Sequence, residues 1–455
     1  MSVLVGRLSN GPADTGSIPL YQPLLHPSVR RQNGYFDRVQ GGILISIVLL
    51  APIPMASNHP LAWLLWAILI GIISTIQTVR TDLGIIPKNL AGRIALGLGC
   101  AFILFSGLQA LPVFAGPSWP IVIYSSAPSA SFLGAIRTIS YLLFFLLLVH
   151  ISQKQNLTKR LALVLFLGIS GHALAAMSAL KLFGDTSLLI EKSAYFGVAT
   201  GGFGNRNAFA MFLGMGVVLG LAQCGRFGSQ KGNFTSRLLP LIAMWLALAI
   251  ILTALIATQS RMGIAATACA CLLALPTASP NRAKHLLAIA GLGIVLTAYF
   301  GQGLGERFSD LQTAFSTRMA LYAQVWKMIG ARPFSGHGLD SFPIAFEQFH
   351  AAPVTAGLVW DKAHSVYLTL WAEMGLIIGS IPIVLGILAA AVLRKKTRFI
   401  GENYHLASAA LAALVLVGLH SVFDFGLEIE ANMFLFLALI AMGTGTIDKT
   451  KGSSP

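Results

Sequence analysis

The stretch GQGLGERFSDLQTAFSTRMALYAQVWKMIGARPFSGHGLDSFPIAFEQFHAAPVTAGLVWDKAH, residues 301–364, separates two groups of long apolar runs. It is the only long polar segment between runs of membrane-spanning length. It contains three of the ten histidines, His337, His350 and His364, together with Arg307, Arg318, Arg332, Glu306, Glu347, Asp310, Asp340 and Asp361. We expect the flanking runs to hold this segment at one face of a membrane, with chemistry beneath it.

The composition places the chain among membrane proteins. Of its 455 residues 55% are hydrophobic and only 10% are charged, and the mean hydropathy is +0.75. Soluble domains carry about 25% charged residues. The apolar runs are about 17–25 residues long, the length of a helix that crosses a hydrocarbon core of about 30 Å. Short segments of alternating hydrophobicity, typical of a transmembrane β-barrel, are missing. The sequence therefore predicts an all-α polytopic membrane protein.

The apolar runs predict about twelve transmembrane helices, at residues 41–57, 61–79, 92–114, 132–150, 161–183, 206–223, 238–257, 261–276, 285–301, 366–392, 404–422 and 431–447. We expect five regions: a disordered tail, nine spans, an outer loop of short helices, three spans and a short tail, at 1–40, 41–301, 302–365, 366–447 and 448–455.

The basic residues predict the orientation. With the N-terminus inside, 21 of the 31 lysines and arginines fall on the inner side, and every inner segment has at least two. This is the positive-inside pattern. Both termini are then cytoplasmic, and the loop 302–365 is outside, which in a Gram-negative cell means the periplasm. The net charge of +15 is largely explained by these inner loops, so nucleic acid is not an expected partner.

The motif ATGGFGNRNAFAMF, residues 199–212, predicts an anion site at a helix start. Asn205 is a suitable N-cap, and Arg206 follows in the first turn. The free N–H groups of a helix start attract an anion, and a guanidinium can hold phosphate through two hydrogen bonds. The alternative is a flexible turn whose arginine snorkels to the membrane surface.

The same pattern occurs twice more, where Ser260 precedes Arg261 and Thr317 precedes Arg318. All three arginines are expected outside. Three capped helix starts with arginine could converge on one polyanion. The alternative is that each arginine only marks a membrane interface.

His364 is the candidate general base, because it lies where the outer loop enters a span and its side chain titrates near neutral pH. Asp361 could orient it or only cap the helix. Glu373 lies two and a half turns further on. A carboxylate buried in a membrane is costly, so we expect it to have a partner or to line a cavity.

The remaining polar residues have less specific interpretations. His337, in the turn-rich segment 331–342, is expected to shape the pocket and could touch substrate. His420 and Asp424 are four residues apart and are interpreted as a structural hydrogen-bonded pair on one helical face. The histidines of the outer loop lack the HExxH spacing, so neither a metal site nor a cofactor is expected.

The segments GGFGNRNAFAMF, QSRMG, RMALYAQVWKMIGARPFSGHGLDSF and AHSVYLTLWAEMG together resemble the O-antigen ligase/polymerase family. They occur in the family's order, between about residues 200 and 375, with a long outer loop before the last of them. The first five spans match only in hydropathy. The chain departs from the family at Ser365, where members often have asparagine after the histidine.

This resemblance implies a metal-independent, inverting membrane glycosyltransferase of the GT-C type, in the inner membrane. Its donor would be a glycan on undecaprenyl diphosphate, and its acceptor a hydroxyl of a glycan or lipid at the periplasmic face. Carried over residue by residue, the resemblance assigns the diphosphate to Arg206, Arg261 and Arg318 and the acceptor proton to His364. Possible supporting residues are Asn205, Asn207, Ser260, His337, Asp361 and Glu373.

Several alternatives stay open. The motifs do not separate an O-antigen ligase of lipopolysaccharide biosynthesis from a polymerase of O-antigen or exopolysaccharide. A transporter or flippase for the same lipid-linked sugar is a second hypothesis, although the halves show no obvious repeat. A structural membrane protein is the third, and it leaves the outward arginines unexplained.

Overall fold

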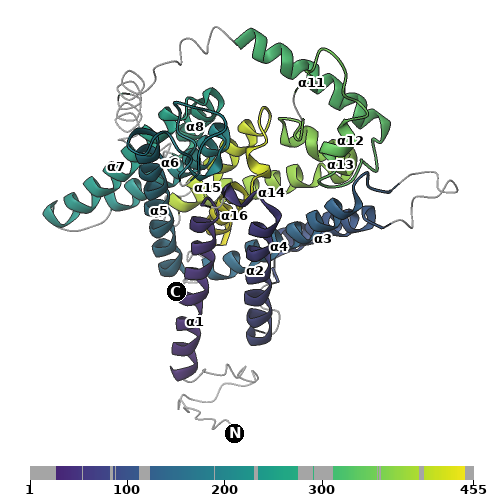
Figure 1. The fold of residues 1–455 in the computed structure, drawn as a ribbon. Coiled ribbons are helices and arrows are strands. Elements are labelled where there is room, and N and C mark those ends of the chain that lie inside the picture. The colour runs from purple at the N-terminus through teal and green to yellow at the C-terminus, as the bar shows by residue number, and fades with distance from the viewer. Residues whose placement is uncertain are drawn as a thin grey trace, which may run out of the picture.

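The computed structural model describes residues 27–53, 55–81, 86–87, 89–111, 123–188, 190–229, 234–274, 291, 311–355, 357, 360–398 and 404–445. Within these ranges the chain is helical and has no β-strand beyond an isolated bridge between Ser187 and Ile190 (Figure 1). The predicted all-helical class is therefore confirmed for the described part of the chain.

The helices before the outer loop are α1 (Pro27–Leu50), α2 (Pro60–Thr81), α3 (Leu90–Gln109), α4 (Pro128–Ser152), α5 (Gln155–Lys181), α6 (Arg206–Gly228), α7 (Phe234–Ala257) and α8 (Arg261–Ala274). Those that follow are α11 (Leu311–Ala331), α12 (Phe342–Phe346), α13 (Val366–Ile378), α14 (Ile381–Lys396), α15 (Tyr404–His420) and α16 (Glu430–Gly445). Three short 3-10 turns are η1 (Met55–Ser57), η3 (Gly201–Phe203) and η4 (Gly426–Glu428).

Six of the described helices, α2 to α7, are long and apolar enough to cross a membrane. α13 and α14 together form a seventh candidate, but they are bent by 88°. The helices α8, α15 and α16 are apolar and shorter. The structure thus supports a helical membrane protein, but the described residues do not reproduce the predicted count of twelve spans. The predicted span 285–301 lies outside them.

The bend between α13 and α14 corrects the single straight span predicted at 366–392. Gly375 has φ +74°, and a Cβ there would come within 2.2 Å of the Phe334 carbonyl oxygen. Only glycine tolerates both the backbone angle and this close approach. Pro382 then starts α14, where the missing N–H costs nothing.

The structure also corrects the predicted disordered tail 1–40. α1 begins at Pro27, so residues 27–40 are helical, and residues 1–26 lie outside the described part. Polar contacts hold this first half of α1 against its neighbours. Asp37 pairs with Lys154, and the Arg80 guanidinium lies over the Phe36 ring.

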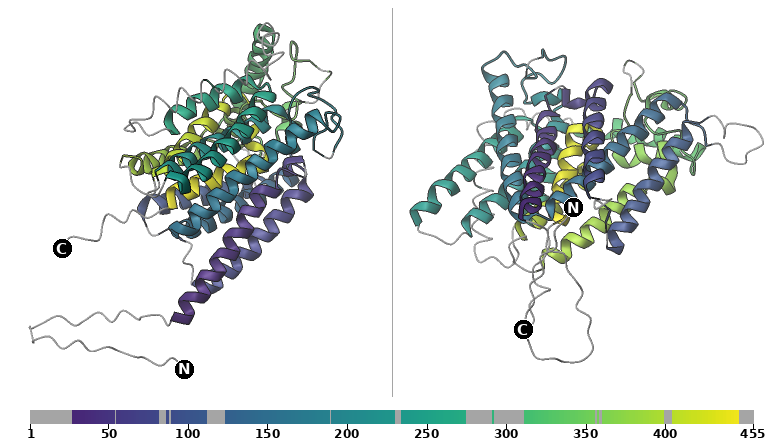
Figure 2. Two further views of the ribbon diagram at one scale, coloured as in Figure 1. Left: turned by 90° about the vertical axis from the view of Figure 1, so that its left-hand side faces the viewer. Right: turned by 90° about the horizontal axis from the view of Figure 1, so that it is seen from below.

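The helix α6 forms the centre of the bundle. Residues 208–224 of α6 are all buried, and α6 packs against α5, α7, α8 and α15. Figure 2 shows the long helices side by side, with α15 and α16 in yellow between them. Glycines permit the close approach: a Cβ at Gly214 would lie 2.4 Å from Thr267 Oγ1, and one at Gly216 would lie 2.5 Å from Ile169 Cγ2. Small residues at helix contacts are typical of membrane bundles.

The helices α11 and α12 and the start of α13 form a second unit with its own core. Leu321, Val325, Phe342, Phe346 and Leu368 are buried together in it. This unit lies at the end of the molecule away from the first turn of α1 (Figure 1). It contains most of the predicted outer loop, but α11 has 21 residues and is not one of the short helices expected there.

Candidate functional site

The start of α6 is built as the sequence predicted. The Asn205 side chain accepts hydrogen bonds from the backbone N–H of Asn207 and of Ala208, at 2.8 and 3.1 Å, and so caps the helix. Arg206 is its first residue, and its Cζ lies 5.6 Å from the ring centroid of Tyr195. The Nε and Nη1 of Arg206 are buried and have no hydrogen-bond partner among the described residues. Donors suited to an anion are therefore left unused at this helix start.

Asn207 joins this helix start to two other segments. Its amide nitrogen donates to Asp424 Oδ2 over 2.9 Å, and its amide oxygen accepts from the Ser260 hydroxyl over 2.9 Å. Ser260 in turn accepts from the Gly263 N–H at 3.2 Å, which caps α8 as predicted. Because Arg261 is the first residue of α8, the helix starts of both predicted arginines lie side by side.

Arg318 is also associated with this site, but it does not lie at a helix start as predicted. α11 begins at Leu311, so Arg318 lies two turns inside the helix and not at its start. Its positive charge nevertheless lowers the pKa of Tyr195, His364 and Asp424, so it is within electrostatic range of all three. The predicted convergence of outer arginines thus rests on tertiary packing of α11 and not on a third capped helix start.

His364 ends the outer segment, immediately before α13. Its backbone has φ +53°, and its carbonyl accepts a hydrogen bond from the Tyr322 hydroxyl at 2.8 Å. The imidazole contacts the Phe425 ring edge-on, with centroids 5.2 Å apart. Nδ1 is buried without a hydrogen-bond partner among the described residues.

The surroundings of His364 keep its imidazole neutral. Burial lowers its pKa from the usual value, and the charge of Arg318 lowers it further. The carboxylates of Asp424 and Asp361 oppose this shift. A neutral imidazole at physiological pH can accept a proton, as a general base must.

Asp424 is a member of the site that the sequence interpretation missed. α15 ends at His420, so the predicted pairing of the two on one helical face is wrong. Asp424 instead bonds to Asn207 and to the Gly426 N–H at 3.0 Å, while the ring nitrogens of His420 have no hydrogen-bond partner among the described residues. Burial raises the pKa of Asp424, and the nearby His364 and Arg318 lower it. In the sequence, the feature that could have indicated Asp424 as a site residue is its position just after the predicted span 404–422.

Glu373 and His337 support the outer unit and do not join the cluster around His364. The carboxylate of Glu373 accepts from the backbone N–H of Asp340 and Phe342, at 2.9 and 3.0 Å, which confirms the expected partner. His337 Nε2 is 3.0 Å from the carbonyl oxygen of Met328. These contacts fix the turn 336–341 on α11 and α13. Asp361 is exposed and acts on His364 only through its charge.

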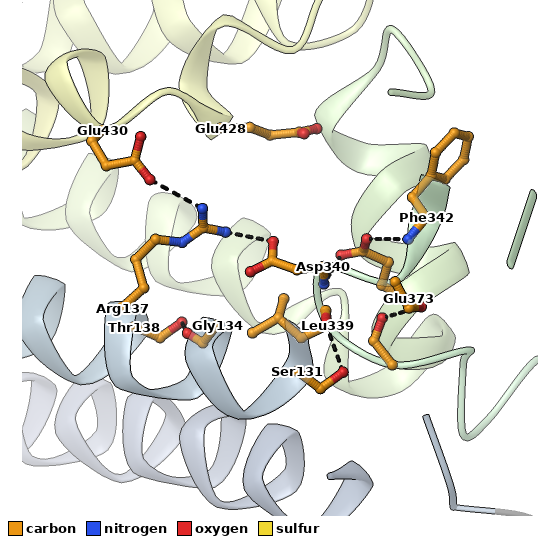
Figure 3. Close-up of polar contacts among 12 residues, drawn as sticks. Ser131, Gly134, Arg137, Thr138, Leu339, Asp340, Phe342, Glu373, Glu428 and Glu430 are labelled. Atoms are coloured by element: carbon orange, nitrogen blue, oxygen red, sulfur yellow. Dashed lines mark hydrogen bonds and ion pairs between the residues drawn. The ribbon is translucent and has the colours of Figure 1, made fainter. Parts of the chain in front are cut away.

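A second polar cluster lies beside the first and was not anticipated. Arg137 on α4 pairs with both Asp340 and Glu430, as Figure 3 shows. Lys362 pairs with Glu428 at 3.0 Å. Lys362 lies two residues before His364, and Glu428 lies four residues after Asp424. The cluster therefore fixes the two segments that carry these members of the site.

Residues 246–383 match the model of a protein family described as O-antigen ligase. The matched region includes Arg261, Arg318 and His364, whereas Arg206 and Asp424 lie outside it. No curated protein matches the chain. The match supports the assignment to the O-antigen ligase/polymerase family that the motifs predicted, and with it a ligase- or polymerase-type membrane enzyme. It does not favour the transporter hypothesis.

Proposed function

We propose that the chain is a membrane glycosyltransferase that moves a glycan from undecaprenyl diphosphate to an acceptor hydroxyl at the periplasmic face of the inner membrane. One observation carries the proposal. The candidate base His364 lies within electrostatic reach of Arg318 and Asp424, and Asp424 is hydrogen-bonded to the helix start that bears Arg206. A base and cationic groups suited to a diphosphate thus share one site.

The cationic side of the site suits the leaving group. As the bond between the sugar and the diphosphate breaks, negative charge grows on the phosphate oxygens. Arg206, Arg261 and Arg318 would stabilise that charge, together with the N–H groups at the starts of α6 and α8. Preorganised donors of this kind contribute about 3–4 kcal/mol each in known enzymes.

The basic side of the site suits the acceptor. The neutral imidazole of His364 would take the proton from the acceptor hydroxyl as its oxygen attacks the anomeric carbon. The carbon–oxygen bond to the diphosphate breaks, and undecaprenyl diphosphate leaves. The carboxylate of Asp424 would stabilise the imidazolium that forms.

Attack from the side opposite the leaving group inverts the anomeric centre. The arginines supply positive charge without a metal ion, and the donor is already activated. We therefore propose an inverting, metal-independent reaction that needs no cofactor. A polymerase and a ligase share this chemistry at the reacting atoms and differ in the glycan or lipid that supplies the acceptor hydroxyl.

The test uses purified protein in liposomes with lipid-linked repeat units, with and without lipid A–core. Longer glycan chains identify a polymerase, and transfer only to lipid A–core identifies a ligase. In either case the His364→Ala variant must lose the transfer. If the purified protein formed no glycosidic bond but moved the lipid-linked glycan across the bilayer, the transporter hypothesis would replace this proposal.

A further inference from the structure

Tyr195, in the segment between α5 and α6, contacts the site at a point that the proposed function does not use. Its ring lies over the Arg206 guanidinium, and 38% of the residue is exposed. It therefore lies at the surface of the site and not in the core. No feature of the sequence singled it out.

The contact holds Arg206 without occupying its hydrogen-bond donors. A guanidinium above the face of a ring is attracted by the ring's electrons, while its N–H groups point outward in its own plane. The Nε and Nη1 of Arg206 have no hydrogen-bond partner among the described residues. The tyrosine thus restrains the arginine without using these two donors, which stay free for an anion.

The same tyrosine extends toward the other half of the site. Burial and the charge of Asp424 raise its pKa, and the charge of Arg318 lowers it. Tyr195 is therefore near the α11 arginine as well as the α6 arginine. A single side chain contacts or approaches two of the groups assigned to the diphosphate.

The segment that carries Tyr195 is tied down by one ion pair. Lys192 pairs with Asp185 and also donates to the Val198 carbonyl oxygen at 2.7 Å. Asp185 Oδ2 accepts from the Gly197 N–H at 2.6 Å. Tyr195 has φ +59°, an angle that a non-glycine residue keeps only where its surroundings impose it. Lys192 Nζ also lies 3.5 Å from the Tyr195 carbonyl oxygen, so the ion pair is in direct contact with this backbone.

We propose that Tyr195 is a positioning residue for the lipid diphosphate: it holds Arg206 with its donor edge toward the phosphates, and the Lys192–Asp185 pair holds Tyr195. This inference rests on the proposed function, because it assumes that Arg206 binds the diphosphate. Tyr195 would thus contribute to diphosphate recognition although it lies outside the sequence motifs that contain the arginines and His364.

The experiment measures binding of undecaprenyl diphosphate to the full-length protein in nanodiscs. Tyr195→Ala should weaken binding by about 5- to 30-fold, the loss expected for one partly buried cation–π contact. Tyr195→Phe keeps the ring and should stay within about twofold of the wild type. Phe196→Ala is the matched control, because Phe196 is the exposed neighbour in the same segment.

A double-variant cycle tests the role of the ion pair. Lys192→Met should weaken binding in the wild-type background and have no further effect in the Tyr195→Ala background. Independent, additive losses would overturn the claim that the ion pair acts through Tyr195.

Arg206→Ala separates this inference from the proposed function. If Arg206→Ala abolishes binding and Tyr195→Ala leaves it unchanged, the inference fails and the proposed function stands. If Arg206→Ala leaves binding unchanged, the inference fails together with the assignment of Arg206 to the diphosphate, and the glycan-transfer assay decides the proposed function separately. If Tyr195→Phe weakens binding as much as Tyr195→Ala, the hydroxyl and not the ring is responsible, and the inference fails as stated.

Discussion

The side-chain amide of Asn207 donates a hydrogen bond to Asp424 over 2.9 Å and accepts one from Ser260 over the same distance. The three residues come from the start of α6, the segment after α15 and the start of α8. One amide therefore fixes the helix starts that bear Arg206 and Arg261 relative to a buried carboxylate. This link explains how residues 217 positions apart in the chain act as one site.

Replacing Asn207 by leucine should disturb this arrangement while keeping the branched shape of the side chain. The substitution removes one hydrogen bond from Asp424 and one from Ser260, at a cost of about 1.5–3 kcal/mol for the bond to the carboxylate. We expect a lower unfolding temperature and a lower rate of glycan transfer. Asn58→Leu, at an exposed position, is the control and should change neither. If Asn207→Leu kept the wild-type unfolding temperature and rate of glycan transfer, these two hydrogen bonds would contribute to neither stability nor activity.

Replacing His364 by alanine should remove the base. We expect glycan transfer to fall by about 10²- to 10⁴-fold, the usual contribution of a positioned base. Binding of the lipid diphosphate should be retained, because the arginines are intact. His350→Ala in the same outer segment serves as the control, since its ring contacts the Val354 carbonyl oxygen and the Phe346 ring instead of the cluster around His364. Transfer by His364→Ala within about twofold of the wild type contradicts the role.

The pH dependence of the transfer rate should show a limb on the acid side. Burial lowers the pKa of His364 from 6.5, so the active neutral form is lost only as the pH falls below that value. The charge of Asp424 raises this pKa. Asp424→Asn removes that charge, so the limb should move to lower pH and the maximal rate should fall. A limb that stays in place would mean that Asp424 does not act on His364, and a limb that moves to higher pH would contradict the sign of its effect.

Breaking the pair between Lys362 and Glu428 should destabilise the outer segment. Lys362→Met leaves Glu428 as a largely buried carboxylate without its partner, which costs about 3 kcal/mol. We expect a lower unfolding temperature, partly restored in the double variant Lys362→Met/Glu428→Gln. Lys327→Met, at an exposed position, is the control. No recovery in the double variant would indicate that the pair itself is not the cause.

The sequence predicted those parts of the site that depend on neighbouring residues. The caps at Asn205 and Ser260 follow from side-chain chemistry within one turn of a helix, and both are present. The same rule misplaced Arg318, because a threonine before an arginine also occurs inside a helix. In α11 the residues from Leu311 onward already form the helix, so no cap is needed there.

Contacts between distant residues could not be predicted in this way. Arg137 meets Glu430 across 293 positions and Asp340 across 203, and nothing local to any of them indicates the pairing. The span predicted at 366–392 differs from the structure for a related reason. A run of apolar residues gives the length of a helix, but the bend at Gly375 depends on how closely the backbone of Phe334 approaches. Both features are decided by tertiary packing.

The most direct test of the central claim is the transfer of glycan by the purified protein in liposomes that contain a lipid-linked glycan and an acceptor. The account predicts a new glycosidic bond and an equal amount of released undecaprenyl diphosphate, both lost in His364→Ala and in the triple variant Arg206→Ala/Arg261→Ala/Arg318→Ala. A product that forms at the wild-type rate in either variant would contradict it.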